Sequence, residues 1–273
     1  MGSSNETESL SGLLLGKPDW CLVNRKGTAA ICQRVESPNR RGDAGWLHCL
    51  SDPKPPPPPP KPKTEKPVPL ADFGDLACKY QEALIRIDLV AEELGVSERS
   101  LERLNCGWNG NVTFPMRDSN ERVVGIRIRG KDSKWCVTGS HQGLFWPENI
   151  DCMDRLFLCE GPTDCAALLT LGFQAIGRPS CSGGVGLVQD VLRRHRRDVV
   201  IMSDRDSAKI RPDGSEWYPG QEGAEALAEA IKSLTSSLRV VTPPKHKDIR
   251  QWLNAGATQS TVQSVIDNTG EWR

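Results

Sequence analysis

Acidic residues follow three strand-like segments of this sequence, at residues 156–160, 199–203 and 238–242. Helix-like stretches separate the segments, and alternating strands and helices form a parallel sheet whose strands all end at one edge. We therefore expect the acids to meet at that edge, where ligands bind in such folds. Clustered carboxylates without matching bases suit Mg²⁺ or Mn²⁺, which support phosphoryl transfer. The acids are Glu160, Asp164, Asp204, Asp206 and Asp248.

A proline-rich segment divides the chain. Residues 53–69 hold 10 of the 20 prolines, together with four lysines. This composition predicts an extended polyproline II tether, and an SH3-type ligand is the functional alternative. The predicted domains are a small N-terminal module at 1–52, the linker at 53–69, a helical and β-meander subdomain at 70–153, and an α/β domain at 154–273.

The subdomain before the α/β domain combines helical periodicity with strand alternation. Apolar spacing over residues 71–104, with Ser97 as an N-cap, predicts helices that form either a DNA-reading helix-turn-helix or a packed hairpin. Acidic residues on the second of these helices disfavour contacts with DNA bases. Residues 112–118 and 123–129 alternate with a period of two, which predicts a β-hairpin or meander.

Two further segments have residue types that could bind phosphate. Arg127 and Arg129 alternate along one predicted strand and so share a face, which contacts either phosphates or only solvent. The glycine-rich segment 180–186 precedes a predicted helix. Its backbone amides either hold a phosphate or belong to a plain strand-to-helix turn.

The acidic motifs and the meander resemble those of one protein family. Glu160-Gly161-Pro162-Thr163-Asp164, followed by a helix and then by Asp204-Arg205-Asp206, resembles the toprim pattern. The segments Phe-Pro-Met-Arg-Asp at 114–118, Val-Val-Gly-Ile-Arg-Ile-Arg at 123–129, Lys-Trp at 134–135 and Gly-Leu-Phe at 143–145 are similar to the start of the catalytic core of DnaG-type bacterial primases. The resemblance covers about residues 89–253. Arg205 departs from the family's usual glycine, and the loop 207–220 is longer than the family's turn.

The resemblance implies a fold and individual roles. The fold would be a toprim-type parallel sheet flanked by helices, preceded by a small helical and β-meander primase-like subdomain. Glu160 would be a metal ligand or an acid/base group, Asp204 and Asp206 the metal-holding pair, and Asp164 and Asp248 accessory carboxylates. Template or nucleotide contacts would come from the basic residues Arg117, Arg127, Arg129 and Lys134.

The N-terminal module has four possible zinc ligands, Cys21, Cys32, His48 and Cys49. Primases have a zinc ribbon at this position, and a module this small would need a metal to hold a fold. Ribbon ligands come in Cys-x-x-Cys pairs, however, and this module has none. The module is therefore either a filled Zn²⁺ site or a degenerate ribbon with buried thiols.

The 35 basic and 35 acidic residues give a net charge of zero, so the overall charge does not indicate a partner. Other features of the composition indicate the cellular compartment. The sequence has no signal-peptide core or membrane span, and ten scattered cysteines fit the reducing cytoplasm. We expect a cytoplasmic DNA primase, a nucleotidyltransferase of DNA replication that joins ribonucleoside triphosphates on single-stranded DNA, with a replicative helicase as a partner in trans. The alternatives are a toprim nuclease and a non-catalytic single-stranded-DNA-binding accessory protein.

Overall fold

The computed structural model describes residues 21–24, 26–50, 72–150 and 155–273, which belong to two compact units divided between residues 66 and 67. The predicted linker at 53–69 and the predicted boundary at 153–154 lie outside the described residues. No helix in the described ranges is long and apolar enough to cross a membrane.

The smaller unit contains a three-stranded antiparallel sheet with the order β1-β2-β3. Its elements are β1 (Cys21–Val23), β2 (Ala29–Cys32), the 3₁₀-helix η1 (Gly42–Ala44) and β3 (Trp46–Cys49). Among its described residues, only Ala30 and Cys32 form a buried apolar core, and Arg40 lies over the Trp46 ring at 5.6 Å. So small a core supplies little hydrophobic stabilisation.

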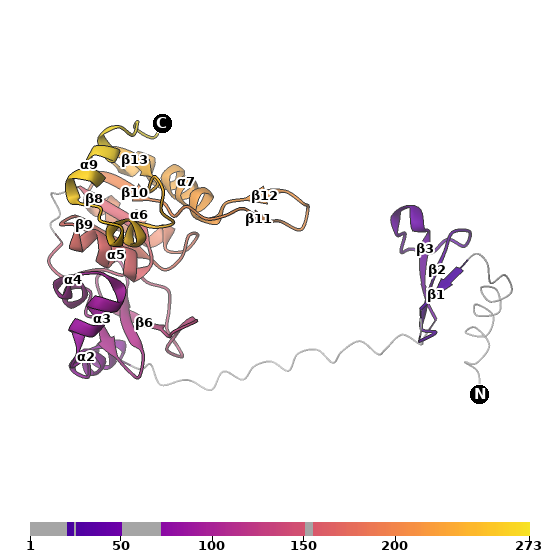
Figure 1. Cartoon of the computed structure of the whole chain (residues 1–273), viewed down its shortest axis with the longest axis horizontal. Coiled ribbons are helices and arrows are strands. Elements are labelled where there is room, and N and C mark those ends of the chain that lie inside the picture. The colour runs from indigo at the N-terminus through magenta and orange to yellow at the C-terminus, as the bar shows by residue number, and fades with distance from the viewer. Residues whose placement is uncertain (1–20, 25, 51–71, 151–154) are drawn as a thin grey trace. The chain divides into compact units, whose positions relative to one another are not determined.

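The larger unit joins a helical and meander subdomain to an α/β domain (Figure 1). The subdomain contains α2 (Phe73–Glu82), α3 (Ile87–Leu94), α4 (Glu98–Arg103), β4 (Gly107–Trp108), β5 (Val112–Arg117), β6 (Val123–Arg129) and β7 (Lys134–Cys136). The α/β domain contains β8 (Leu156–Glu160), α5 (Gly161–Thr170), β9 (Gln174–Arg178), α6 (Val185–Arg194), β10 (Asp198–Met202), β11 (Lys209–Ile210), β12 (Glu216–Trp217), α7 (Pro219–Ile231), η2 (Lys232–Leu234), β13 (Ser237–Val241), α8 (Ile249–Asn254) and α9 (Gln259–Asp267).

Helices α3 and α4 form a packed hairpin. Gly95 ends α3 in the left-handed conformation, with φ of 67°, and the Ser97 hydroxyl caps α4 by accepting from the Ser100 amide. Leu94 and Leu101 are buried in the same core as α5, and the Ser97 amide donates to the Thr170 hydroxyl of α5 at 2.9 Å. The apolar face of the hairpin therefore packs against the α/β domain.

The meander is an antiparallel sheet with the order β4-β5-β6-β7. Along β6, Ile126 and Ile128 are buried, whereas Arg127 and Arg129 lie on the opposite face and are partly exposed. This arrangement confirms the predicted period of two and the predicted shared face of the two arginines.

The α/β domain is built on a four-stranded parallel sheet with the order β13-β10-β8-β9. The sequence predicted three of these strands, and β9 is an additional strand between α5 and α6. Strands β8 and β10 lie in the centre, so the segments that end in Glu160 and Asp204 are direct neighbours. Both are almost wholly apolar and buried, as expected for parallel strands covered on two faces.

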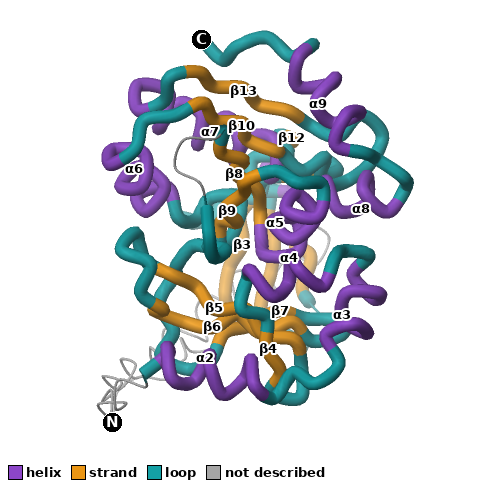
Figure 2. Tube along the Cα trace, turned by 90° about the vertical axis from the view of Figure 1, so that its left-hand side faces the viewer, coloured by secondary structure: helices purple, strands orange, loops and turns teal. Residues whose placement is uncertain are grey.

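Helices cover both faces of the parallel sheet (Figure 2). Helices α6 and α7 lie on one face, and α5, α8 and α9 lie on the other. Alternate side chains of each strand enter the two cores, because side chains point to opposite faces of a strand. Leu158 and Ile201 pack with α6 and α7, whereas Phe157 and Val200 pack with α5, α8 and α9.

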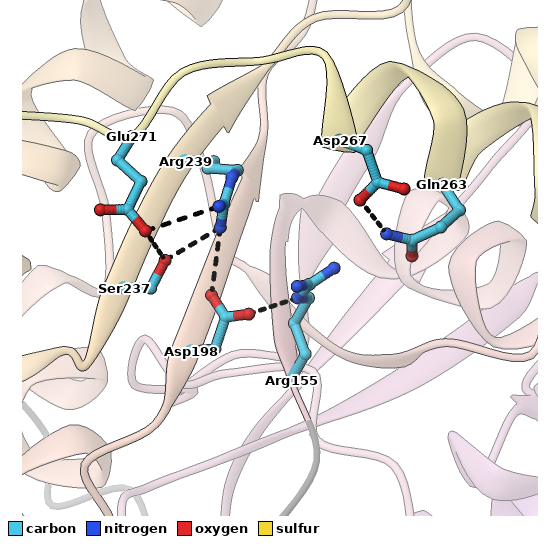
Figure 3. A network of polar contacts seen from close by, with 7 residues as sticks. All are labelled: Arg155, Asp198, Ser237, Arg239, Gln263, Asp267 and Glu271. Atoms are coloured by element: carbon cyan, nitrogen blue, oxygen red, sulfur yellow. Dashed lines mark hydrogen bonds and ion pairs between the residues drawn. The ribbon is translucent and has the colours of Figure 1, made fainter.

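The two edges of the parallel sheet are also paired. At the β9 edge, the backbones of Phe145 and Gly177 exchange two hydrogen bonds of 2.8 and 3.0 Å. At the β13 edge, the Trp272 amide donates to the Leu238 carbonyl at 2.7 Å. Figure 3 shows the polar network beside this edge, where Arg239 bridges Glu271 and Asp198, and Asp198 also accepts from Arg155 at 2.5 Å.

A candidate metal centre at the edge of the parallel sheet

The predicted acids follow the carboxyl ends of β8, β10 and β13. Glu160 is the last residue of β8, Asp204 and Asp206 follow β10, and Asp248 follows β13. Asp248 is also the N-cap of α8, where its Oδ1 accepts from the Gln251 amide at 2.7 Å. Asp164 lies in the first turn of α5, directly after β8, and is buried. Parallel pairing of the three strands thus brings these acids to one edge, as the sequence predicts.

Two glycines shape the backbone at this edge, one through its conformation and the other through close packing. Gly161 follows Glu160 with φ of 80°, a conformation that glycine adopts without strain. Gly220, in the first turn of α7, donates its amide to Asp206 Oδ2 at 3.0 Å. A Cβ atom on Gly220 would lie 2.7 Å from the Asp204 carbonyl oxygen. The start of α7 is therefore seated directly against both aspartates of the Asp-x-Asp motif.

Burial and neighbouring acids raise the pKa of three of these carboxyl groups, Glu160, Asp164 and Asp204. Burial and the charges of Glu160, Asp248 and Asp206 raise the pKa of Asp204 to about 7. Burial and the charge of Asp206 raise the pKa of Glu160. Burial, followed by the charges of Asp204 and Asp248, holds the pKa of Asp164 well above its ordinary value. The edge therefore has excess negative charge that a proton or a cation would offset.

Three basic side chains oppose part of this charge, since Arg178, Lys134 and Lys247 each lower the pKa of Glu160. Arg178, which sequence reasoning missed, is the register partner of Glu160 and is only 4% exposed. Its guanidinium donates to the carbonyls of Gly183 at 3.1 Å and Cys181 at 2.7 Å. The short apolar run that ends at Arg178 was the available signal for this strand.

The chemistry of the donor set fits a hard divalent cation. All five acids supply oxygen ligands, which Mg²⁺ and Mn²⁺ prefer. Asp164 Oδ1 is buried and has no hydrogen-bond partner within the described ranges. In those same ranges, no three His, Cys, Asp or Glu side chains already converge as a complete metal site. The acids thus share an electrostatic field, and metal binding would have to draw their carboxylates together.

Comparison with known proteins identifies the domain that contains this edge. A family model described as "Toprim domain" matches residues 155–258. Residues 155–258 therefore match this domain model, and the α/β domain has the toprim-type fold that the sequence predicts. No curated protein sequence matches the chain.

Solved primase structures have the same fold as the larger unit. The DnaG primase catalytic domain bound to ssDNA is 18% identical with a TM-score of 0.57, and the match covers 72% of this chain and 77% of that one. For the E. coli primase catalytic core, identity is 18%, the TM-score is 0.55, and coverage is 74% and 80%. For the RNA polymerase domain of Mycobacterium tuberculosis DnaG, identity is 15%, the TM-score is 0.54, and coverage is 73% and 82%.

Within the α/β domain, hydrogen bonds from Arg205 connect the acid-bearing loop after β10 to the loop after β13. Its guanidinium donates twice to the Pro243 carbonyl, at 3.1 and 2.9 Å, and its amide donates to the Lys247 carbonyl at 2.6 Å. The loop after β10 is therefore tied to the loop after β13. This structural use accounts for an arginine in the middle of the Asp-x-Asp motif.

The predicted basic residues differ in their surroundings. Arg117 donates to the Glu121 carbonyl and to Asn105 Oδ1, and Arg127 donates to the Pro179 carbonyl and lies 6.0 Å from the centre of the Phe145 ring. These two arginines thus hold parts of the protein together. Arg129 and Lys134 are register partners on β6 and β7. Lys134 is exposed and its charge lowers the pKa of Glu160, and Arg129 lies beside Lys134 in the meander.

The four candidate zinc ligands do not all converge on one point. Cys21 and Cys32 are register partners with their sulfurs 2.7 Å apart, and burial raises the pKa of Cys21 to about 11, with a further contribution from Cys32. His48 Nε2 is already bonded to the Val35 carbonyl, at 3.0 Å. Cys49 pairs with Ala29 and so lies on the opposite face of the sheet from Cys32. These residues do not fit a four-ligand Zn²⁺ site.

Replacing Gly220 with alanine should destabilise the protein by about 1–3 kcal/mol, because the new methyl group would overlap the Asp204 backbone. Urea unfolding followed by circular dichroism measures this change. The matched control is Gly186→Ala in α6, where a Cβ meets no atom within 4 Å. That change should be neutral or stabilising by up to about 1 kcal/mol. Equal stability of the two variants would contradict the close packing of α7 against Asp204.

Proposed function

We propose that this protein is a DNA-directed primase, which joins ribonucleoside triphosphates on a single-stranded DNA template. The observation that carries the proposal is the packing of the basic meander against the end of β9, where Arg127 donates to the Pro179 carbonyl at 3.2 Å and the charge of Lys134 lowers the pKa of Glu160. Negative carboxylates and positive side chains at one place suit a reaction between a polyanionic template and a triphosphate. The primase-core fold supports the same reaction.

Mg²⁺ or Mn²⁺ would be held by Glu160, Asp204 and Asp206, with Asp164 and Asp248 as accessory carboxylates. When bound, such ions neutralise charge on the triphosphate and position the attacking and leaving oxygens. The raised pKa values of Glu160, Asp164 and Asp204 support this assignment, because bound cations would relieve the repulsion that raises them.

The protein's own basic residues would orient the polyanions. Arg129 and Lys134 would contact phosphates of the template or the incoming nucleotide, since they are register partners in the meander and the charge of Lys134 acts on Glu160. Arg178 would position Glu160 through its charge and would keep the loop at Cys181 and Gly183 in place. Arg117 and Arg127 would serve mainly to hold the scaffold, through the hydrogen bonds described above.

The proposed reaction also implies a place and a partner. A template strand and ribonucleotides are available together in the cytoplasm. Because primer synthesis needs single-stranded template, we include a replicative helicase as a partner in trans. The DnaG catalytic domain with similar fold was solved with ssDNA bound, which supports a single-stranded template here.

One assay tests the proposal against its two rivals. The protein is incubated with labelled ribonucleotides, single-stranded DNA and either Mg²⁺ or Mn²⁺, and the products are separated by length. Metal-dependent extension supports a primase, whereas shortening of the DNA supports a toprim nuclease. Binding without either product, on every template tried, supports the accessory protein.

Lys134→Gln should weaken binding of single-stranded DNA several-fold and reduce the slope of log affinity against log salt by about 0.7, because one phosphate contact is lost. Affinity is measured by fluorescence anisotropy across a salt series, without divalent metal. The matched control is Lys79→Gln, which removes an exposed lysine from α2. Identical salt slopes for both variants would remove Lys134 from the nucleic-acid surface.

A further inference from the structure

A β-hairpin interrupts the toprim domain immediately after the Asp-x-Asp motif. Strands β11 and β12 are two residues long, with Lys209 paired to Trp217 and Ile210 paired to Glu216. The turn between them is closed by the Arg211 amide, which donates to the Ser215 carbonyl at 2.8 Å. Figure 1 shows that this hairpin, which we call the arm (residues 207–218), extends away from the parallel sheet.

The arm has no hydrophobic core. Residues 207–216 are all exposed, and Ile210 and Tyr218 are 65% and 41% exposed. An isolated two-stranded hairpin is only marginally stable in water, so apolar burial does not account for this one. Its described contacts instead centre on Trp217, which has Lys209 Nζ 5.9 Å and Arg211 Cζ 5.5 Å from its ring centre.

Both ends of the arm are fixed at the acidic edge. At its start, the Asp206 amide donates to Gln221 Oε1 at 3.3 Å, and Gln221 Nε2 donates back to the Asp206 carbonyl at 3.3 Å. At its end, Gly220 donates to Asp206 Oδ2, and Arg211 pairs with Glu222 at 2.5 Å. A strand of nucleic acid held at Asp206 would therefore pass along the base of the arm.

The arm has two cations and two acids, and one of the acids, Glu216, accepts from the Tyr218 hydroxyl at 3.5 Å. Asp213 accepts from the amide and hydroxyl of Ser215, so this acid is used within the turn. Glu222 neutralises Arg211. Lys209 forms no ion pair within the described ranges, and its described contact is with the Trp217 ring. An exposed lysine beside the Trp217 ring combines a phosphate contact with a surface on which a base stacks.

We propose that the arm binds the single-stranded nucleic acid that the acidic edge acts on, with Lys209 contacting a phosphate and Trp217 and Tyr218 stacking on bases. This inference rests on the proposed function, because it takes its ligand from the reaction assigned to that edge. A cation beside aromatic rings favours a nucleic-acid strand over a protein partner, since every base offers a stacking face regardless of sequence.

The test compares three arm variants in the full chain: Lys209→Gln, the pair Trp217→Ala with Tyr218→Ala, and all three changes together. Affinity for a labelled oligonucleotide of about 20 nucleotides is measured by anisotropy across a salt series, without divalent metal. Lys209→Gln should reduce the salt slope by about 0.7. The aromatic pair should weaken binding about tenfold or more with the slope retained, because stacking is not ionic. The triple variant should show both effects.

Two controls keep the result interpretable. Trp108→Ala removes a tryptophan that is 40% exposed on β4, at the edge of the meander opposite to β7, and this variant should bind as the wild type does. Thermal unfolding should give the same Tm for wild type and arm variants, because the exposed arm contributes no core. If the triple variant retained the affinity and salt slope of the wild type, the arm would have no role in binding.

Primer synthesis is measured beside binding, so that the two proposals can fail separately. If the wild type makes primers and every arm variant binds DNA as the wild type does, the proposal for the arm is wrong and the proposed function stands. If binding depends on the arm but no primers form on any template, the binding role of the arm stands and the primase assignment is wrong. A wild type that binds no single-stranded DNA would overturn both.

Discussion

Asp204→Asn should abolish nucleotide joining and, at the same time, stabilise the metal-free protein at pH 8. The substitution removes one of the proposed metal-holding charges at nearly constant volume, so activity should fall by more than about 10³-fold. The stabilisation follows from the repulsion at the acidic edge, where burial and three neighbouring acids raise the pKa of Asp204 from an ordinary 3.8 to about 7.

The pH dependence has a definite sign. Between about pH 4 and pH 7, the folded wild type holds a proton on Asp204 that the unfolded chain releases. The free energy of unfolding of the metal-free wild type should therefore fall as pH rises through this window. With about 1.4 kcal/mol for each unit of pKa difference, the loss amounts to up to about 4 kcal/mol at pH 8. Asparagine does not titrate, so the variant avoids this loss.

Urea unfolding in EDTA at pH 5 and pH 8 measures the effect, and addition of Mg²⁺ should stabilise the wild type more than Asp204→Asn. Asp132→Asn, in the exposed turn before β7, is the control and should follow the wild type at both pH values. A variant whose stability fell between pH 5 and pH 8 as much as that of the wild type would show that Asp204 does not carry the repulsion.

Arg178→Met should destabilise the protein by about 3 kcal/mol. Methionine fills much of the same space but leaves the Cys181 and Gly183 carbonyls without their donor and Glu160 without its register-paired cation. The pKa of Glu160 should rise further, because Arg178 is one of the charges that lower it. Urea unfolding measures the loss, with Arg99→Met on the exposed face of α4 as the control.

A double-mutant cycle isolates the charge interaction. Combining Arg178→Met with Glu160→Gln should recover part of the lost stability, because the carboxylate that needed the cation is gone. Recovery should be smaller below pH 4, where Glu160 is protonated in the wild type as well. Strictly additive effects at pH 8 would show that Arg178 acts only through its hydrogen bonds to the loop.

The acid-bearing strands could be predicted because their signal is local. Apolar runs at 156–160 and 199–203 end directly in acids, and parallel pairing then brings those acids to one edge. Strand β9 was missed because its five residues include Gly177, which is atypical of strands. A Cβ at Gly177 would overlap the Gly161 carbonyl, so close packing against the start of α5 requires a glycine at this position. Such a contact leaves no periodic pattern in the sequence.

The environments of the other candidates depend on contacts distant in sequence. Alternation placed Arg127 on the polar face of a strand, but only tertiary structure shows Pro179, 52 residues away, as its hydrogen-bond partner. Register likewise decides that Cys49 lies across the sheet from Cys32. The arm was recognisable as a long loop, yet strands of two residues are too short for an alternating pattern to appear.

The paired edges of the parallel sheet bear on how this protein can associate. An open edge strand is a template on which another chain can add a strand, and this is a common route to aggregation. Here the backbone of Phe145 forms hydrogen bonds with β9. The Trp272 amide forms a hydrogen bond with a carbonyl of β13, beside the ion pair of Glu271 and Arg239. Before a strand from a second copy or a partner could extend this sheet, one of these segments would have to break its backbone hydrogen bonds and leave the edge. Association through the α/β domain is therefore directed to side-chain surfaces, where recognition is more selective than backbone pairing.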